Sequence, residues 1–203
     1  CKAPMHPNLR HLQSKCSAYS HTARHNMVRN VLGRELRRAH TSSMVKVESG
    51  SQSSAGGAFY RADLVLLHGG STHFIDVTVS AYNNALSQTK QPPGRWTGFR
   101  FNQAPSKSAA NAAETTKMKY MLKANAGRDA VLVPAAACTM GRIAPQFAAL
   151  LRRTAETATA SWSADESRST IYKPTSETLA RRMAQLIGAA IAKGNAATVD
   201  RAH

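Results

Sequence analysis

A pair of glycines between two runs of strand-forming residues constrains the fold more than any other feature of the sequence. Residues 59–67 and 72–80 are rich in β-branched, aromatic and aliphatic residues, and Gly69-Gly70 lies between them. Because glycine tolerates the positive φ angles of tight hairpin turns, we expect an antiparallel β-hairpin. A two-residue turn and a four-residue loop give the same register, in which Leu64 lies opposite Ile75.

This register sorts the side chains onto two chemically different faces. Side chains alternate along a strand, so one face collects only apolar residues, and we expect it to face the core. Its members are Tyr60, Ala62, Leu64, Leu66, Ile75, Val77 and Val79. The other face carries Arg61 and Thr78, and it places Asp63 directly opposite Asp76. Like charges in directly opposed positions are destabilising unless a positive charge lies between them.

Two carboxylates in opposed positions are typical of a divalent metal site. Directly opposed Cβ atoms lie about 4.5 to 5.5 Å apart. Mg²⁺ takes oxygen ligands at about 2.0 to 2.1 Å and often keeps water molecules. Asp63 and Asp76 are therefore candidate ligands for Mg²⁺ or Mn²⁺. The alternative is that both are solvated aspartates on an exposed face of the sheet.

A helix expected over residues 108–126 supplies a candidate lysine. At 100° per residue, Lys117 falls within the stripe expected to be buried, whereas Lys119 points nearly the opposite way. The other residues of that stripe are Ala109, Ala113, Tyr120 and Ala124. A buried lysine needs an anionic partner, and beside a metal-bound phosphate it can orient or deprotonate water. The alternative is that the stem of Lys117 follows the apolar surface until its amine reaches solvent.

The order of the expected elements predicts an α/β fold. Apolar residues at helical spacing predict helices, and short β-rich runs predict strands outside the hairpin. The helices are expected over 24–39, 108–126, 141–158 and 176–193, and the further strands over 43–49 and 129–137. Helix, three strands, helix, strand and two helices predicts a mixed sheet flanked by helices.

The charge of the chain favours a polyanionic partner. Lys and Arg number 27 against 11 acidic residues, which gives a net charge of +16, and this excess favours nucleic acid over an anionic membrane. No apolar run approaches the roughly 20 residues needed to span a bilayer. We therefore expect an intracellular protein, nuclear in a eukaryotic host. Three cysteines do not suit a disulfide framework, and a start at Cys1 suggests a fragment of a longer protein.

The order of these motifs resembles the restriction-like endonuclease region of site-specific non-LTR retrotransposon proteins. RADLVLLHGGSTHFIDVTV is similar to the PD-(D/E)XK signature, with Asp63 and Asp76 separated by twelve residues. In that family a zinc knuckle and an arginine-histidine motif precede the acidic pair, and a helix ending in lysine and tyrosine follows it. The matching residues here are Cys1, His11 and Cys16, the RHN of 24–26, and the KMKY of 117–120. The resemblance covers most of residues 1–150.

The resemblance implies a metal-dependent endonuclease that nicks double-stranded DNA. Asp63 and Asp76 would bind Mg²⁺ or Mn²⁺, and the catalytic lysine would be Lys117 or Lys119. It also implies a restriction-endonuclease-like core with the order α-β-β-β-α-β. The implied partners are double-stranded DNA, element RNA and an upstream reverse transcriptase region of the same polyprotein. The expected divisions are a zinc-knuckle remnant over 1–23, the core over 24–160, and a polar linker with a C-terminal helix over 161–203.

Two departures from the family pattern leave a second function open. The usual proline before the first aspartate is Ala62, and the lysine expected two residues after the second is Thr78. In the retrotransposon branch that lysine is thought to come from the following helix, which points to Lys117 or Lys119. The alternative is a degenerate remnant that binds DNA or RNA without cleaving it.

The N-terminal segment and several basic residues are further candidates. Cys1, His6, His11 and Cys16 recur every five residues and offer four ligands suitable for Zn²⁺, although ordinary knuckles begin with a close cysteine pair. The alternative is a loose polar segment. Cys138 is expected in the core. The candidate contacts to nucleic acid are Arg24, His25, Arg61, Arg95, Trp96 and Arg100. The alternatives are that His25 caps the first helix and that the segment around Trp96 is a solvated loop.

Overall fold

The secondary structure follows the order that the sequence predicts. A computed structural model describes residues 17–41, 43–51, 60–80, 105–124, 130–164 and 174–200. Its elements are α2 (Ser17–Ala39), β1 (Met44–Ser51), β2 (Tyr60–His68), β3 (Ser71–Ser80), α3 (Pro105–Ala124), β4 (Val131–Cys138), α4 (Pro145–Ala164) and α5 (Ser176–Asp200). The expected α/β class is confirmed, although α2 begins seven residues earlier than predicted, at Ser17 rather than residue 24.

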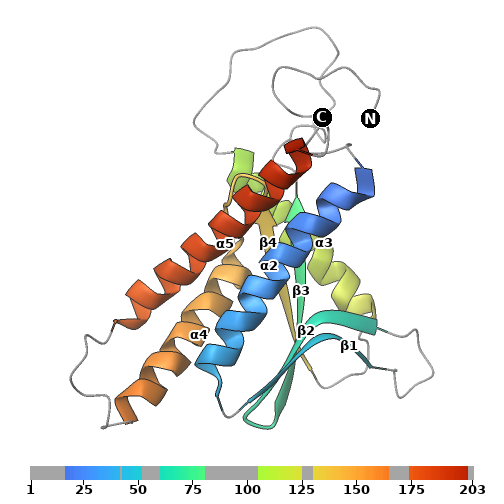
Figure 1. Ribbon diagram of the computed structural model, residues 1–203. Helices are drawn as coiled ribbons and strands as arrows, with labels where there is room; N and C mark the ends of the chain where they lie inside the picture. Colours follow the sequence, from blue (N-terminus) through green and yellow to red (C-terminus); the bar gives the residue numbers. More distant parts are fainter. Residues whose placement is uncertain are drawn as a thin grey trace, which may run out of the picture.

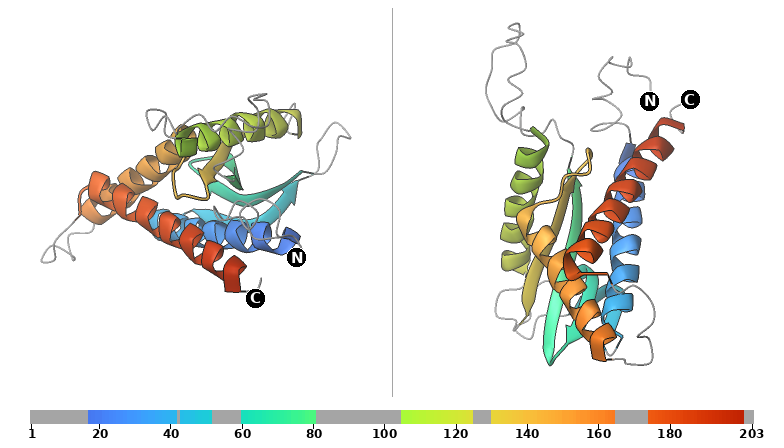
Figure 2. Two further views of the ribbon diagram at one scale, coloured as in Figure 1. Left: turned by 90° about the horizontal axis from the view of Figure 1, so that it is seen from above. Right: turned by 90° about the vertical axis from the view of Figure 1, so that its left-hand side faces the viewer.

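The strands form one mixed sheet between two layers of helices. Its order is β1-β2-β3-β4, with β1, β2 and β3 antiparallel and β4 parallel to β3. Helix α3 connects the two parallel strands and covers one face of the sheet, whereas α2, α4 and α5 cover the other (Figures 1 and 2). None of the described helices is long and apolar enough to cross a membrane.

The hairpin has the tight turn that its glycines predict. His68 lies opposite Ser71, and the two residues between them have positive φ angles, 56° at Gly69 and 76° at Gly70. Two consecutive positive φ angles give a turn whose twist matches that of the flanking strands. The register places Leu64 opposite Ile75, as predicted.

The larger apolar core lies between the sheet and the three-helix layer. β2 and β3 contribute Leu64, Leu66, Ile75 and Val77, which confirms the predicted core face for these four residues. α2 and α5 contribute buried residues at helical spacing, and these include Val28, Leu32, Leu36, Met183, Ile187 and Ile191. The C-terminal helix is therefore part of the same core.

The opposite face of the sheet is also buried, because α3 packs on it. Val65 and Phe74 form a second cluster with Met121 of α3, and Ala62 belongs to this cluster rather than to the predicted one. The prediction for Ala62 was wrong: the β1–β2 pairing omits Asp63, and beyond that gap Ala62 packs with Val65 and Phe74 rather than with Leu64. Tyr120 was also predicted to be buried, but it is 56% exposed.

Two glycines of α5 provide a matched test of the packing between α2 and α5. A Cβ atom at Gly194 would lie 2.6 Å from Cγ and 2.9 Å from Cα of Arg24, whereas a Cβ atom at Gly188 would meet nothing within 4 Å. We expect Gly188→Ala to stabilise the protein by up to about 1 kcal/mol through helix propensity. We expect Gly194→Ala to destabilise it by about 1 to 3 kcal/mol through overpacking. Urea denaturation measures both, and equal stabilisation would contradict the close approach.

Candidate active site

The candidate site lies where β2 separates from β3. Residue pairing between these strands runs from the turn to Leu64 and Ile75, one residue short of the two aspartates. The β1–β2 pairing is interrupted at the same level, where Glu48 has a φ of 50°. A positive φ is uncommon for a residue other than glycine. The backbone around Asp63 therefore departs from regular sheet geometry. At this irregular position the carboxylate contacts β3 and α2.

The carboxylate of Asp63, on β2, contacts both strand β3 and helix α2. Its Oδ2 accepts a 2.7 Å hydrogen bond from the backbone N–H of Val77. The same oxygen lies 2.9 Å from Nε2 of His25, and the two side chains are only 17% and 29% exposed. His25 lies three and seven residues before the core residues Val28 and Leu32, which places it on the sheet-facing side of α2. The carboxylate is thus held in one orientation by groups from two elements.

Asp76 forms an ion pair with the lysine that the helical periodicity singled out. Nζ of Lys117 lies 2.9 Å from Oδ2 of Asp76, and the side chain of Asp76 is 6% exposed. α3 crosses the sheet so that Lys117 reaches β3 from the opposite side to His25 (Figure 2). Nζ also lies 5.4 Å from the ring centroid of Tyr120. Each aspartate therefore has one nitrogen partner, His25 of α2 for Asp63 and Lys117 of α3 for Asp76, and the two partners come from different helical layers.

The two aspartates have opposite pKa shifts. Burial raises the pKa of Asp76 to about 6, with a further contribution from its hydrogen bond to Asp63 that the charge of Lys117 only partly offsets. Burial also acts to raise the pKa of Asp63, but hydrogen bonds from His25, Asp76 and Val77 lower it to about 2. The hydrogen bond to Asp63 raises the pKa of His25 in turn. Between about pH 2 and pH 6 the pair therefore keeps one proton, on Asp76, rather than two negative charges.

This arrangement fits a hard divalent cation. Two carboxylates that are close enough to share a proton carry excess negative charge when both ionise, and a cation between them relieves that repulsion. Mg²⁺ is commonly bound through one or two carboxylates, with water and substrate phosphates completing its coordination. Asp63 and Asp76 supply such a pair. Within the described residues no group of three or more His, Cys, Asp or Glu side chains is arranged to hold a metal ion.

The remaining predicted residues lie apart from this cluster where the structure describes them. Lys119 is exposed on α3, two residues from Lys117 but without a contact to either aspartate. Arg61 is exposed and forms an ion pair with Glu48. Arg24 is 1% exposed, and its guanidinium donates a 3.2 Å hydrogen bond to Asn195 of α5 rather than lying on the surface.

The other candidates fall outside the described residues. These are the proposed zinc ligands Cys1, His6, His11 and Cys16, and the proposed nucleic-acid contacts Arg95, Trp96 and Arg100. Their roles stay predictions. Cys138, by contrast, is the last residue of β4 and is fully buried in a cluster with Ala109 and Ala110 of α3, as expected.

Sequence reasoning missed two structural roles. His25 was a candidate for contact with the phosphate or for capping the first helix, and its contact with Asp63 was not foreseen. Its position on the core side of α2 was the available signal. Asn195 joins three elements, because its Oδ1 accepts from Arg24 while its Nδ2 donates to the carbonyl of Thr139 at 2.9 Å. No local pattern in the sequence indicates this second contact.

Comparison with known proteins does not assign the chain to a family. No protein-family model matches the sequence, and no curated protein matches it with significant similarity. The chemistry of the site therefore has to be inferred from the geometry around Asp63 and Asp76.

Proposed function

We propose that the chain is a metal-dependent endonuclease domain that nicks double-stranded DNA. The observation that carries this proposal is the cluster of Asp63, Asp76 and Lys117 at the point where two strands of a mixed sheet separate. Two acidic groups can hold a metal ion that activates water, and a lysine can stabilise charge on the phosphate, so the cluster suits metal-assisted phosphodiester hydrolysis. The motif order that resembles the PD-(D/E)XK endonucleases supports the same reaction.

Each residue of the cluster has a separate role in this proposal. Asp63 and Asp76 would hold Mg²⁺ or Mn²⁺, and the bound ion would stabilise negative charge on the scissile phosphate. Lys117, released from Asp76 when a divalent ion takes its place, would orient water or donate to a phosphate oxygen. His25 acts as a positioning residue, because its hydrogen bond fixes the orientation of the Asp63 carboxylate.

The resemblance extends the proposal to the cellular role of the domain. A retrotransposon-derived endonuclease would cut a chromosomal target in the nucleus of a eukaryotic host. It would work with a reverse transcriptase region and with element RNA, and Zn²⁺ would be bound by a knuckle near the N-terminus. These points rest on the order of the sequence motifs alone.

One observation favours the alternative of a non-catalytic DNA- or RNA-binding domain. Lys117 already forms an ion pair with Asp76, and His25 already holds Asp63, so the charged groups have partners without a metal ion. A degenerate site would keep this network as structural support.

Conversion of supercoiled plasmid to the open circular form separates the two functions. We expect nicking by the full chain in Mg²⁺ or Mn²⁺ and none in EDTA, because the carboxylates act through the metal ion. Failure to nick with any divalent ion, while DNA binding persists, would favour the non-catalytic domain.

The two lysines of the KMKY motif give an internal comparison. We expect Lys117→Ala to reduce the nicking rate by about 10²- to 10⁴-fold, the range typical of a positioned proton-transfer group. Lys119→Ala should leave the single-turnover rate within about threefold, because Lys119 is exposed and has no contact with the aspartates. Single-turnover kinetics at saturating enzyme measure both. Equal losses would contradict the assignment of Lys117.

A further inference from the structure

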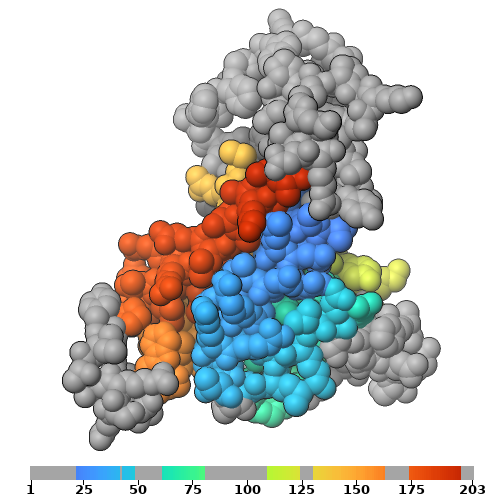
Figure 3. Space-filling model, in the orientation of Figure 1, coloured from blue at the N-terminus to red at the C-terminus, as the bar shows by residue number. Residues whose placement is uncertain are grey.

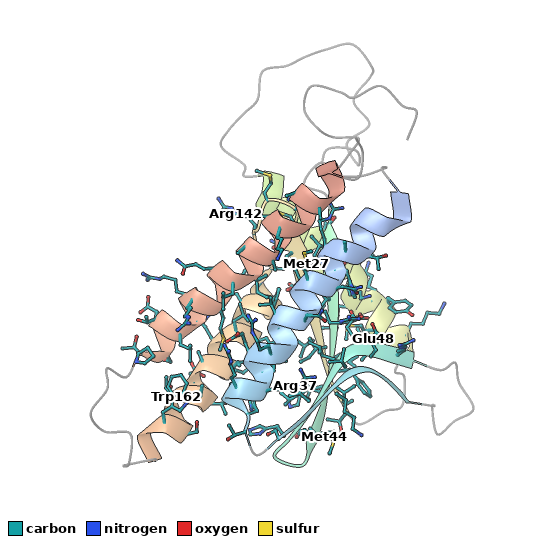
Figure 4. The ribbon with its side chains drawn as sticks, in the orientation of Figure 1. Met27, Arg37, Met44, Glu48, Arg142 and Trp162 are labelled. Carbon is teal, nitrogen blue, oxygen red and sulfur yellow. The ribbon has the colours of Figure 1, made fainter. Side chains whose placement is uncertain are left out.

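Exposed basic side chains give the three-helix layer of α2, α4 and α5 a positive charge. Figure 3 shows these helices on one face of the molecule, and Figure 4 labels Arg37 near the C-terminal end of α2. Eight basic side chains are exposed on the described parts of these helices. They are Arg34, Arg37, Arg38, Arg152, Arg153, Arg181, Arg182 and Lys193. These residues are called the basic layer below.

Acidic residues neutralise only part of the basic layer. Glu35, whose side chain is 9% exposed, pairs with both Arg34 and Arg38, and Glu177 pairs with Arg181. Among the residues of these helices whose side chains the structure describes, the third acid is Glu156, which is exposed. Eight cations against three acids leave a clear positive excess, and exposed arginines suit phosphate because each presents a planar fork of N–H donors.

The basic layer does not have the side chains that single strands or membranes require. The exposed large hydrophobic residues of the described chain are Met44, Val47, Tyr120, Leu122, Val131 and Met140. None of them belongs to the described parts of α2, α4 or α5. Single-stranded nucleic acid is bound largely by stacking on exposed aromatic rings, and insertion into a membrane surface needs exposed apolar side chains. A positively charged surface that has neither exposed aromatic rings nor exposed apolar side chains is best suited to bind the phosphate backbone of a duplex.

We propose that the basic layer is a binding surface for the backbone of double-stranded DNA, separate from the cleavage site. Arg34, Arg37 and Arg38 follow one another at helical spacing on the side of α2 opposite to its buried residues. Contacts from such a surface go to phosphates and carry no sequence information, so binding would be tight but non-specific. This inference goes beyond the endonuclease proposal, because it does not require Asp63 or Asp76 to bind metal.

The basic layer is also distant from the candidate active site along α2. Arg37 lies twelve residues after His25, which corresponds to about 18 Å along a helix axis. Arg24 and Arg61, two of the predicted nucleic-acid contacts, are instead buried or paired with Glu48. The proposed electrostatic contact therefore moves from the vicinity of the aspartates to the exposed arginines and lysine of α2, α4 and α5.

Two triple variants of the full chain test this surface. The first changes Arg37, Arg153 and Arg182 to Gln, and the matched control changes Lys46, Lys119 and Lys123 to Gln. The control residues are exposed on β1 and α3, and both triples remove three positive charges. Affinity for a 30-base-pair duplex is measured in EDTA across a salt series, so that cleavage plays no part.

We expect the first triple to lose at least tenfold in affinity at about 0.1 M salt. Its slope of log K against log salt should fall by about 2 to 3, since each lost phosphate contact contributes about 0.9. The control triple should change the affinity by less than about threefold. Equal losses in the two triples, or a greater loss in the control, would overturn the proposal, because net charge or the α3 side would then govern binding.

Two further ligands test the choice of partner. Single-stranded DNA of the same length should bind more weakly than the duplex, and vesicles containing 30% phosphatidylserine should bind the two triples alike. A preference for the single strand would overturn the duplex assignment. Vesicle binding lost only in the Arg37, Arg153 and Arg182 triple, with DNA binding unchanged, would assign the basic layer to an anionic membrane instead. Each of these results is independent of whether the wild-type chain nicks DNA.

Discussion

Asp63→Asn and Asp76→Asn are each expected to reduce nicking by at least about 10³-fold while leaving DNA binding nearly intact. Either substitution removes a negative ligand oxygen and its charge from the proposed metal pair, so the ion that stabilises the reacting phosphate is bound weakly or misplaced. Binding should persist because phosphate contacts from basic residues dominate affinity for DNA. Neither aspartate belongs to the basic layer.

Plasmid nicking in Mg²⁺ and Mn²⁺, beside a gel-shift titration in EDTA, measures this separation. Glu156→Gln is the matched control, because it also removes one negative charge but lies exposed on α4, outside the site. It should nick at the wild-type rate. Unchanged nicking in both aspartate variants would refute the metal pair, and parallel loss of binding and nicking would indicate a folding defect.

The hairpin and its register could be predicted because local chemistry decides them. Gly69 and Gly70 are at the positions that require positive φ, and the alternation around Leu64 and Ile75 allows only one register without charge in the main core. The same reasoning located Asp63 and Asp76 at the same level of the hairpin. Lys117 followed from helical spacing, since a lysine within a buried stripe needs an anionic partner.

The burial of both faces of the sheet could not be predicted from this hairpin. The two aspartates left open whether the face that carries them is a metal site or a solvated surface, and Val65 and Phe74 on it pack against Met121 of α3. Whether a partly apolar strand face is covered depends on where a distant helix docks, which period-two alternation does not specify. The misassignment of Tyr120 has the same cause: Ala109 is buried as predicted, but Ala110 and Met121 are buried in place of Tyr120.

The detailed geometry of the site depends on a break in the sheet. Pairing ends between Leu64 and Asp63, so the two carboxylates are not simply opposed side chains on a regular ladder. Asp63 accepts the N–H of Val77 that a strand carbonyl would otherwise accept, and it also contacts His25. Predictions from sequence patterns assume regular strand geometry. Departures from that geometry, such as the positive φ of Glu48, depend on tertiary contacts.

Without divalent ions, the two aspartate variants are expected to change stability in opposite directions at pH 7. Asp76→Asn should raise the free energy of unfolding by about 1 to 3 kcal/mol, because the wild-type protein must ionise a buried carboxyl whose pKa is raised to about 6. Asparagine removes that ionisation, and its amide is able to donate to Asp63. Asp63→Asn should lower the free energy by about 1 to 3 kcal/mol, because it removes a charge-assisted hydrogen bond to His25.

The pH dependence of stability follows from the signs of the two shifts. The folded-state pKa of Asp63 is lowered to about 2, so its stabilising contribution is present above about pH 4 and is lost as the pH falls toward 2. The folded-state pKa of Asp76 is raised to about 6, so its contribution is present below about pH 4 and is lost as the pH rises through 6. Together the pair contributes most near pH 4. Asp76→Asn should remove the decline between pH 4 and 6.

Thermal and urea denaturation from pH 3 to 8 in EDTA measure both effects, with Glu156→Gln again as the control.

Adding Mg²⁺ distinguishes a metal site from a structural ion pair, because an ion that binds only the folded wild type raises its stability with ion concentration. Neither asparagine variant should show that increase in full. If Asp76→Asn instead destabilised the protein as much as Asp63→Asn, the ion pair with Lys117 would be stabilising the fold. That result would favour the non-catalytic alternative. Higher stability together with lost nicking in Asp76→Asn is expected of a carboxylate retained for chemistry rather than for folding.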